Sequence, residues 1–117
     1  MKKIYYLSTC DTCKEILADI QAEKRGFTLQ DIKTENITPT QLDEMKAVAG
    51  SYEALFSRRA RKYKEMGLKD QALTEKDYRW LILEEYTFLK RPVTWVGKQL
   101  FVGSEKATIE ALKSTLR

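Results

Sequence analysis

The strand-helix-strand pattern of residues 3–32 constrains the fold more than any other feature of the sequence. Residues 3–7 are rich in β-branched and aromatic side chains and end at a Ser-Thr pair, which is typical of a buried strand. Apolar residues then recur at helical spacing, and the predicted helix ends at Gly26. Residues 27–32 alternate apolar and polar, which indicates a second short strand. Two strands separated by a helix most simply pair in parallel, so we expect an α/β fold.

The middle of the chain predicts helices and no convincing strand. Residues 38–41 form a capping box with proline at the first helical position, and the apolar spacing continues this helix to Gly50. A second cap at residues 74–77 begins a helix that we expect to extend through Leu89. We therefore predict a helical insertion between the two halves of the sheet.

The last part of the chain predicts a β-hairpin and a closing helix. Residues 93–96 and 99–102 are strand-like runs around a Gly-Lys turn. Ser104 with Glu105 then begins a final helix that is apolar on one face. The order β-α-β, helical insertion, β-β-α is that of a mixed sheet of the thioredoxin-like (glutaredoxin-like) kind.

The length of 117 residues suits one domain that buries roughly two-thirds of its unfolded surface. We expect a single domain, residues 1–117, with a thioredoxin-like core at about 1–37 and 91–117 and the helical insertion at about 38–90. No run approaches about 18 consecutive apolar residues, and no signal peptide is evident. A cytoplasmic protein without a membrane partner is the expectation. The apolar surroundings of three large aromatic residues predict that they lie in the core: Trp80, Trp95 and Phe101.

The chain contains no histidine and only two cysteines. This composition excludes catalysis of the Ser-His-Asp and Cys-His types, and a zinc site would need carboxylates to complete it. We therefore expect no metal. Any acid-base chemistry must come from cysteine, aspartate, glutamate, lysine or tyrosine.

Cys10 and Cys13 lie at the junction of the first strand and the first helix. Unpaired N–H groups and the positive end of the helix dipole stabilise an anion there, so we expect the pKa of Cys10 to fall below about 8.5. Cys10 is the candidate nucleophile, and Cys13, one turn further along, is the candidate resolving thiol. The alternative is a pair of inert apolar cysteines, or half of a metal site for which the sequence offers no second pair of cysteine or histidine ligands.

The same junction offers backbone N–H groups that could cradle arsenate, phosphate or sulfate, so Thr9 and Thr12 are candidate oxyanion-binding residues. Arg91 would complete the site, because its planar guanidinium binds tetrahedral oxyanions through two donors. It precedes Pro92, and a cis bond between them would hold this backbone beside Cys10, although most bonds before proline are trans. The alternative for Arg91 is a solvated loop charge.

A basic run at residues 58–69 holds six basic residues and one acid, and it accounts for the formal net charge of +4. It has three interpretations: a solvated helix face, the source of one arginine (Arg58 or Arg59) for the anion site, or a surface that binds an acidic partner. We do not expect direct binding to nucleic acid, since Tyr63 is the only interleaved aromatic residue and no nucleic-acid-binding module is recognisable.

Six blocks of the sequence occur in the order and spacing of a known family: residues 4–6, 10–14, 55–59, 63–68, 91–93 and 97–103. They include Cys10-Asp11-Thr12-Cys13, Ser57-Arg58-Arg59 and Arg91-Pro92-Val93. On these blocks, which span nearly the whole chain, it resembles the ArsC-like arsenate reductase family, which includes the Spx transcriptional regulators. The resemblance implies a thioredoxin-like fold with a helical insertion.

The resemblance also implies a thiol-dependent reductase of arsenate or of a related oxyanion or disulfide. In such arsenate reductases the cysteine matching Cys10 attacks arsenate, and arginines bind the oxyanion. An external thiol reductant, either glutathione with glutaredoxin or thioredoxin, then allows arsenite to leave without a bound cofactor. Arg91 falls on one oxyanion-binding arginine, and Arg58 or Arg59 could serve as another.

Two departures keep a second function open. The chain has no arginine near Val102, where the family has a third, and Tyr6 stands close to the place of a histidine found in some arsenate reductases. The Cys10 and Cys13 pair also resembles the thiol switch of Spx, in which two cysteines form a disulfide under oxidation and the protein contacts the α-subunit of RNA polymerase. The alternative is therefore an Spx-like redox-switched transcriptional regulator.

Overall fold

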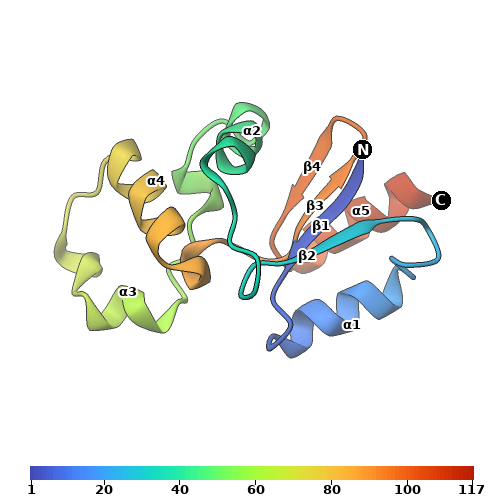
Figure 1. Ribbon diagram of the computed structural model, residues 1–117, viewed down its shortest axis with the longest axis horizontal. Helices are drawn as coiled ribbons and strands as arrows, with labels where there is room; N and C mark the ends of the chain where they lie inside the picture. Colours follow the sequence, from blue (N-terminus) through green and yellow to red (C-terminus); the bar gives the residue numbers. More distant parts are fainter. The chain divides into compact units, whose positions relative to one another are not determined.

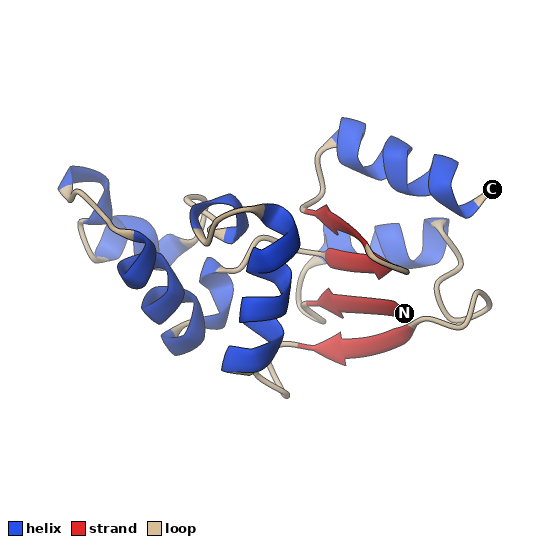
Figure 2. Ribbon diagram, turned by 90° about the horizontal axis from the view of Figure 1, so that it is seen from above, coloured by secondary structure: helices blue, strands red, loops and turns tan.

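A four-stranded mixed sheet forms the first part of the fold in the computed structural model, which describes residues 1–117 (Figure 1, Figure 2). The strand order is β2-β1-β3-β4. β1 pairs in parallel with β2, whereas β3 pairs antiparallel with both β1 and β4. This arrangement confirms the expected α/β fold, including the parallel pair and the C-terminal hairpin. The bounds are Lys2–Tyr6 for β1, Thr28–Asp31 for β2, Val93–Val96 for β3 and Gln99–Val102 for β4.

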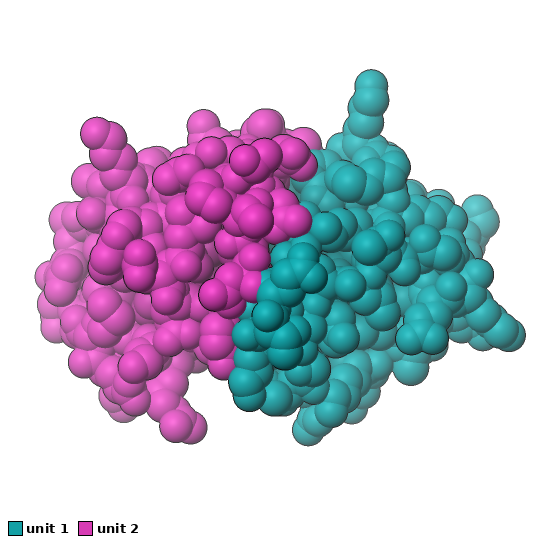
Figure 3. Space-filling model, viewed as in Figure 1, with its two compact units in different colours: residues 1–35, 91–117 teal, residues 36–90 magenta.

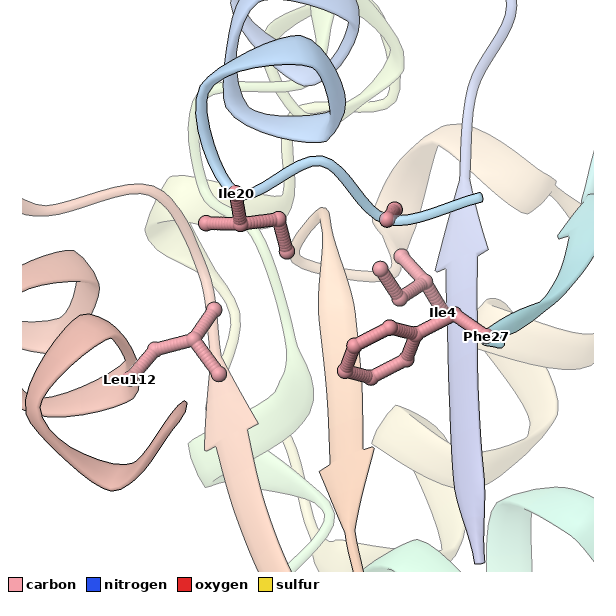
Figure 4. Packing of buried hydrophobic residues seen from close by; sticks show 5 residues of the cluster. Ile4, Ile20, Phe27 and Leu112 are labelled. Atoms are coloured by element: carbon pink, nitrogen blue, oxygen red, sulfur yellow. The ribbon is translucent and has the colours of Figure 1, made fainter. Parts of the chain in front are cut away.

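Two helices, α1 (Asp11–Asp19) and α5 (Lys106–Leu116), pack with this sheet. A cluster of buried apolar side chains joins β1 to both helices: Ile4, Ile20, Ala22, Phe27 and Leu112 (Figure 4). Burying such side chains stabilises the fold by roughly 1.5–3 kcal/mol each. The cluster anchors the C-terminal end of α1 and the helix α5 against β1.

The helix α1 ends before Gly26, contrary to the prediction. Gln21 adopts a left-handed conformation with φ of 51°, and it donates its backbone N–H to the Ala18 carbonyl. The N–H of Ala22 bonds to the Leu17 carbonyl, which completes a Schellman motif. The end of the helix could not be recognised in the sequence, because glycine usually occupies the left-handed position and here the residue is Gln21.

Residues between β2 and β3 form helices and no strand, as predicted; one isolated bridge joins Phe56 to Leu89. The α-helices are α2 (Pro39–Ala49), α3 (Arg61–Glu65) and α4 (Glu75–Glu84), and the 3₁₀ turns are η1 (Glu53–Leu55), η2 (Leu68–Asp70) and η3 (Tyr86–Phe88). Both predicted capping boxes are present, at Thr38 and at Thr74. The helix predicted to reach Leu89 ends at Glu84 instead, because Glu85 is extended and its carboxylate accepts a bond from the next turn.

Stacked aromatic rings form the core of this helical part. The ring centroid of Phe56 lies 5.0 Å from that of Phe88, 4.9 Å from that of Tyr78 and 6.0 Å from that of Tyr63. Trp80 does not join them. The prediction that it lies in the core is wrong, since Trp80 is 58% exposed.

The exposure of Trp80 follows from the geometry of α4. Its buried residues, Tyr78, Leu81 and Ile82, follow the spacing of one helix face, and Trp80 falls outside that face. The other two aromatic residues agree better with the prediction that they lie in the core. Trp95 is buried, and Phe101 is partly buried against the Ile4 cluster.

The chain divides into two compact units (Figure 3). Unit 1 comprises residues 1–35 and 91–117 and contains the sheet with α1 and α5, whereas unit 2 comprises residues 36–90 and contains the other helices. No helix in either unit has the length and apolar character needed to span a bilayer.

Candidate functional site

Cys10 lies between the end of β1 and the first turn of α1, in the blue segment at the start of the chain (Figure 1). Its N–H donates to the Leu7 carbonyl at 3.0 Å, and its own carbonyl accepts from the Lys14 N–H at 3.2 Å. Cys10 is extended, with φ of −98° and ψ of 111°, and it occupies the N-cap position of α1. The backbone thus holds this half-buried sulfur at the positive end of the helix.

A carboxylate at the end of β2 holds the loop that leads to Cys10. Asp31 accepts hydrogen bonds from the N–H groups of Ser8 and Lys33, each at 3.2 Å. Burial opposes its charge, but the bonds from Ser8 and Lys33 outweigh that effect and lower the pKa of Asp31. Sequence reasoning missed this residue. The available signal was that parallel strands end at the same edge of a sheet, so that the end of β2 lies beside the end of β1.

The surroundings of Cys10 favour its thiolate. Partial burial on its own raises the pKa of Cys10. The Cys13 backbone N–H, the Cys13 side chain and the Arg91 guanidinium act in the opposite direction, and together they lower the pKa of Cys10 below its ordinary value. The direction agrees with the sequence expectation, although a guanidinium and a second thiol contribute beside the backbone.

Cys13 has the opposite character. It is fully buried, and the two cysteines lie 3.5 Å apart with both thiols free. Burial raises the pKa of Cys13 to about 12, and the neighbouring Cys10 adds to the rise. The pair therefore consists of one thiolate-forming sulfur and one protonated sulfur that serves as its hydrogen-bond donor.

Arg91 reaches the two cysteines from the start of β3. The Arg91–Pro92 peptide bond is cis, and the Pro92 carbonyl accepts the Gly103 N–H at 2.9 Å. Because β3 runs antiparallel beside β1, the residues that precede β3 lie near the end of β1. The Arg91 guanidinium lowers the pKa of Cys10 and also acts on Cys13, so the structure brings these three predicted site residues together.

The other predicted site residues divide into two groups. Thr9 and Thr12 are exposed on either side of Cys10, and their hydroxyl groups make no hydrogen bond within the chain. Arg58 and Arg59 belong to unit 2. Arg58 donates to Glu53 at 2.7 Å and to the Tyr78 hydroxyl at 3.1 Å. The roles of these four residues in an oxyanion site remain predictions.

The groups around Cys10 determine the chemistry available at this site. No group of three or more histidine, cysteine, aspartate or glutamate residues is arranged to hold a metal ion. The groups that surround Cys10 are instead a buried thiol, a guanidinium and backbone N–H groups. This arrangement can stabilise an anion, whether it is the thiolate itself or an oxyanion that the thiolate attacks.

Comparison with known proteins gives one family and one fold. Residues 5–112 match the model of the ArsC family. In sequence the chain is similar to the global transcriptional regulator Spx 2 of Bacillus anthracis, with 22% identity over 107 residues, 88% of this chain and 79% of that protein. In structure it is similar to a YffB protein, with a TM-score of 0.84, 22% identity and 100% coverage of both chains. It is also similar to an arsenate reductase from Vibrio cholerae, with a TM-score of 0.78, 18% identity and coverage of 96% and 95%. These neighbours confirm the thioredoxin-like fold.

Proposed function

The chain belongs to the ArsC family, and on this premise we propose that it is a thiol-dependent oxidoreductase that reduces arsenate or a related oxyanion or disulfide. One observation carries the proposal: a half-buried sulfur whose pKa is lowered lies beside the Arg91 guanidinium, and a second sulfur lies 3.5 Å away. A nucleophile, an anion-binding group and a resolving thiol are the parts that this chemistry needs.

The first chemical step belongs to Cys10. Its thiolate attacks the arsenic(V) of arsenate, a sulfur–arsenic bond forms, and one oxygen takes up protons and leaves as water. Arg91 offsets the negative charge of the oxyanion during this attack. We assign to Thr9 and Thr12, which are exposed and stand before and after Cys10 in the chain, the role of lining the bound oxyanion.

The second step belongs to Cys13. Its sulfur attacks Cys10 Sγ, the disulfide forms, and the sulfur–arsenic bond breaks with its electron pair left on arsenic, which departs as arsenic(III). The resting Cys13 is a poor nucleophile because burial and the neighbouring Cys10 raise its pKa to about 12. Once Cys10 carries an adduct its negative charge is gone, and one of the causes that keep Cys13 protonated disappears with it. An external dithiol, or two glutathione molecules, then reduces the disulfide.

Steady-state reduction of arsenate by the full chain tests this proposal, with glutathione and glutaredoxin supplied in one assay and thioredoxin in another. Cys10→Ser should abolish turnover with every donor, and full activity in that variant would end the argument. Arg91→Gln should raise KM for arsenate and raise the pKa of Cys10, because it removes a positive charge that faces both the oxyanion and the Cys10 sulfur. Arg61→Gln, which removes an equal charge from an exposed position in unit 2, is the matched control.

Two variants of Cys13 separate its roles. Cys13→Ser keeps a hydrogen-bond donor beside Cys10 but cannot form a disulfide, whereas Cys13→Ala loses both functions. If Cys13 resolves the adduct, both variants lose multiple turnover and retain the first adduct, and only Cys13→Ala raises the pKa of Cys10. If glutaredoxin resolves it directly, Cys13→Ser turns over normally in the glutaredoxin assay.

A second candidate function has its own supporting observation. The chain is similar to a regulator named Spx, and its two free cysteines are close enough to become a disulfide with a small movement. An Spx-like redox-switched regulator would bind the α-subunit of RNA polymerase. Binding of that subunit that differs between the oxidised and reduced protein, together with no turnover of arsenate, would favour the regulator. Turnover without binding would favour the reductase.

A further inference from the structure

The basic run of residues 58–69 ends beside an apolar groove in unit 2. The groove has a volume of about 260 Å³ and is lined by residues from the end of α3, from η2 and from α4 with the segment that precedes it. Its lining is mostly apolar: Met66, Leu68, Gln71, Ala72, Leu73, Asp77, Trp80 and Leu81. The carboxylate of Asp77 is occupied in the capping box, where it accepts bonds from the N–H and the hydroxyl group of Thr74. The groove therefore offers an apolar floor and no unused acid.

Two large apolar side chains at this groove are exposed to water. Trp80 is 58% exposed and Met66 is 45% exposed, and they are two of the four large hydrophobic residues that the fold leaves uncovered. Exposed tryptophan and methionine side chains are over-represented in surfaces that bind protein partners. The packing of α4 does not require the Trp80 ring, because the buried face of this helix is complete without it.

Basic side chains that lack a carboxylate partner lie in the chain segment that leads into the groove. Arg61, Lys64 and Lys69 are exposed and make no ion pair. Lys62 has a long contact of 3.8 Å with Glu65. Residues 61–70 hold four exposed basic side chains and two exposed acids, Glu65 and Asp70, so this segment keeps an excess of positive charge. The exposed acids at the start of α4, Glu75 and Asp77, both accept backbone hydrogen bonds.

The size and the lining of the groove favour one kind of occupant. A volume of about 260 Å³ is below the roughly 300–1,000 Å³ of small-molecule sites, but it accommodates one or two large apolar side chains. A nucleic acid would use the basic rim and leave the apolar floor empty. An amphipathic helix uses both, because it places apolar anchors in a groove and charged residues at its edge.

We propose that this groove is a docking site for an acidic amphipathic segment of a partner protein, with apolar side chains seated on Trp80 and Met66 and carboxylates facing Arg61, Lys64 and Lys69. The site involves none of the residues Cys10, Cys13 and Arg91. The proposal assigns the basic run to partner binding, and it holds whether these three residues form a reductase site or a redox switch.

Fluorescence anisotropy with a labelled synthetic peptide tests the proposal on the full chain. The probe is a tryptophan-free peptide of about four helical turns, with leucine and phenylalanine on one face and glutamate on the other. One control peptide has the same composition in an order that destroys the apolar face, and another has lysine in place of glutamate. We expect the probe to bind at least about tenfold more tightly than either control. Binding should also shift the emission of Trp80 to shorter wavelength as its ring leaves water.

Four variants locate the binding. Trp80→Ala should weaken binding at least about tenfold, and Val48→Ala, which truncates another exposed apolar residue of unit 2, should change it less than about twofold. Lys64→Glu with Lys69→Glu should weaken binding about tenfold and flatten its salt dependence. Lys98→Glu with Lys106→Glu removes the same charge from unit 1 and should have less than about a third of that effect. Circular dichroism checks that every variant is folded.

Three results would each overturn the proposal. One is equal binding of the acidic peptide and its shuffled control. Another is unchanged affinity in Trp80→Ala or in the double lysine variant. The third is displacement of the peptide by a DNA duplex whose own binding is indifferent to Trp80→Ala, which would assign the surface to nucleic acid.

Discussion

Two helices of unit 2, α2 and α4, begin differently from α1 of unit 1. In unit 2, α2 and α4 begin at Thr38 and Thr74, whose hydroxyl groups accept the N–H of the third helical residue in a complete capping box. In unit 1, α1 begins at Cys10, whose side chain has no oxygen with which to cap a helix. The position that stabilises a helix in unit 2 therefore holds the candidate nucleophile in unit 1. The comparison teaches that the same helix-end N–H groups can serve either stability or reactivity.

The means of support differ between the units as well. Backbone bonds of the sheet and one carboxylate, Asp31, hold the region around Cys10. In unit 2 the aromatic rings around Phe56 pack the core, and long charged side chains such as Arg79 join the helices at the surface. A reacting sulfur needs the first kind of support, because its position must be kept within a narrow range. The second kind suits a surface that meets partners.

The largest expected effect concerns the aromatic core of unit 2. Phe56→Ala removes a fully buried ring that contacts three others, so it should lower the free energy of unfolding by about 3–5 kcal/mol. Urea unfolding followed by circular dichroism measures it. Trp80→Ala is the matched control, because it removes a larger but exposed ring and should cost less than about 1 kcal/mol. Equal losses in the two variants would contradict the assignment of the core.

The second expected effect contrasts the two sulfurs of unit 1. Cys10 has a pKa below 9.0, whereas that of Cys13 is about 12, so their thiolate fractions at neutral pH differ at least about 1,000-fold. The stronger intrinsic nucleophilicity of a high-pKa thiolate recovers roughly 20-fold. Iodoacetamide should therefore alkylate Cys10 at least about 50-fold faster than Cys13, and burial of Cys13 widens the gap. Mass spectrometry of the native and the urea-denatured protein measures both rates; comparable native rates would remove the distinction between the two thiols.

Local patterns predicted most of this fold, and two local details were missed. The capping boxes at Thr38 and Thr74 and the parallel strand pair depend on neighbouring residues or on simple connectivity, and the structure confirms them. The end of α1 was missed because glutamine, and not glycine, takes the left-handed position, and the exposure of Trp80 was missed because its place on the helix face was not weighed.

Some residues of the candidate site could be predicted from a local motif, and others only from the fold. Cys10 and Cys13 stand three residues apart along the chain and could be singled out from one motif, together with the direction in which the pKa of Cys10 moves. The support that Asp31 gives to the loop was missed, because it requires knowing that β1 and β2 end side by side. The cis bond at Arg91–Pro92 was one of two isomers that the sequence left open. The chemical roles of these residues stay predictions until they are assayed.

A third prediction tests the comparison of helix starts directly. Cys10→Ser supplies a capping oxygen to α1 and should raise the free energy of unfolding by about 0.5–1 kcal/mol while it abolishes the reactivity. Thr74→Ala removes the cap of α4 and should lower it by about 1 kcal/mol. Urea titration of both variants measures the pair. A loss of stability in Cys10→Ser would show that the sulfur itself supports the helix, which the comparison denies.

The smallest expected effect lies at the surface of unit 2, where Arg79 donates two bonds to Asp43, at 2.9 and 3.1 Å, and the Tyr52 hydroxyl donates a third at 2.6 Å. The bonds from Arg79, followed by that from Tyr52, lower the pKa of Asp43 from 3.8 to about 2. Because the pKa of Asp43 is lower in the folded than in the unfolded protein, its bonds contribute fully to folding stability above about pH 4. This contribution is lost as the pH falls through about 2. Asp43→Asn should therefore lower Tm slightly at neutral pH, and its difference from the unmodified protein should shrink on acidification to about pH 2. Thermal unfolding at several pH values measures the difference.

The control is Asp70→Asn, which removes an exposed carboxylate without an ion pair and should show no such trend. An identical trend in both variants would mean that the surface network of unit 2 adds nothing to its stability.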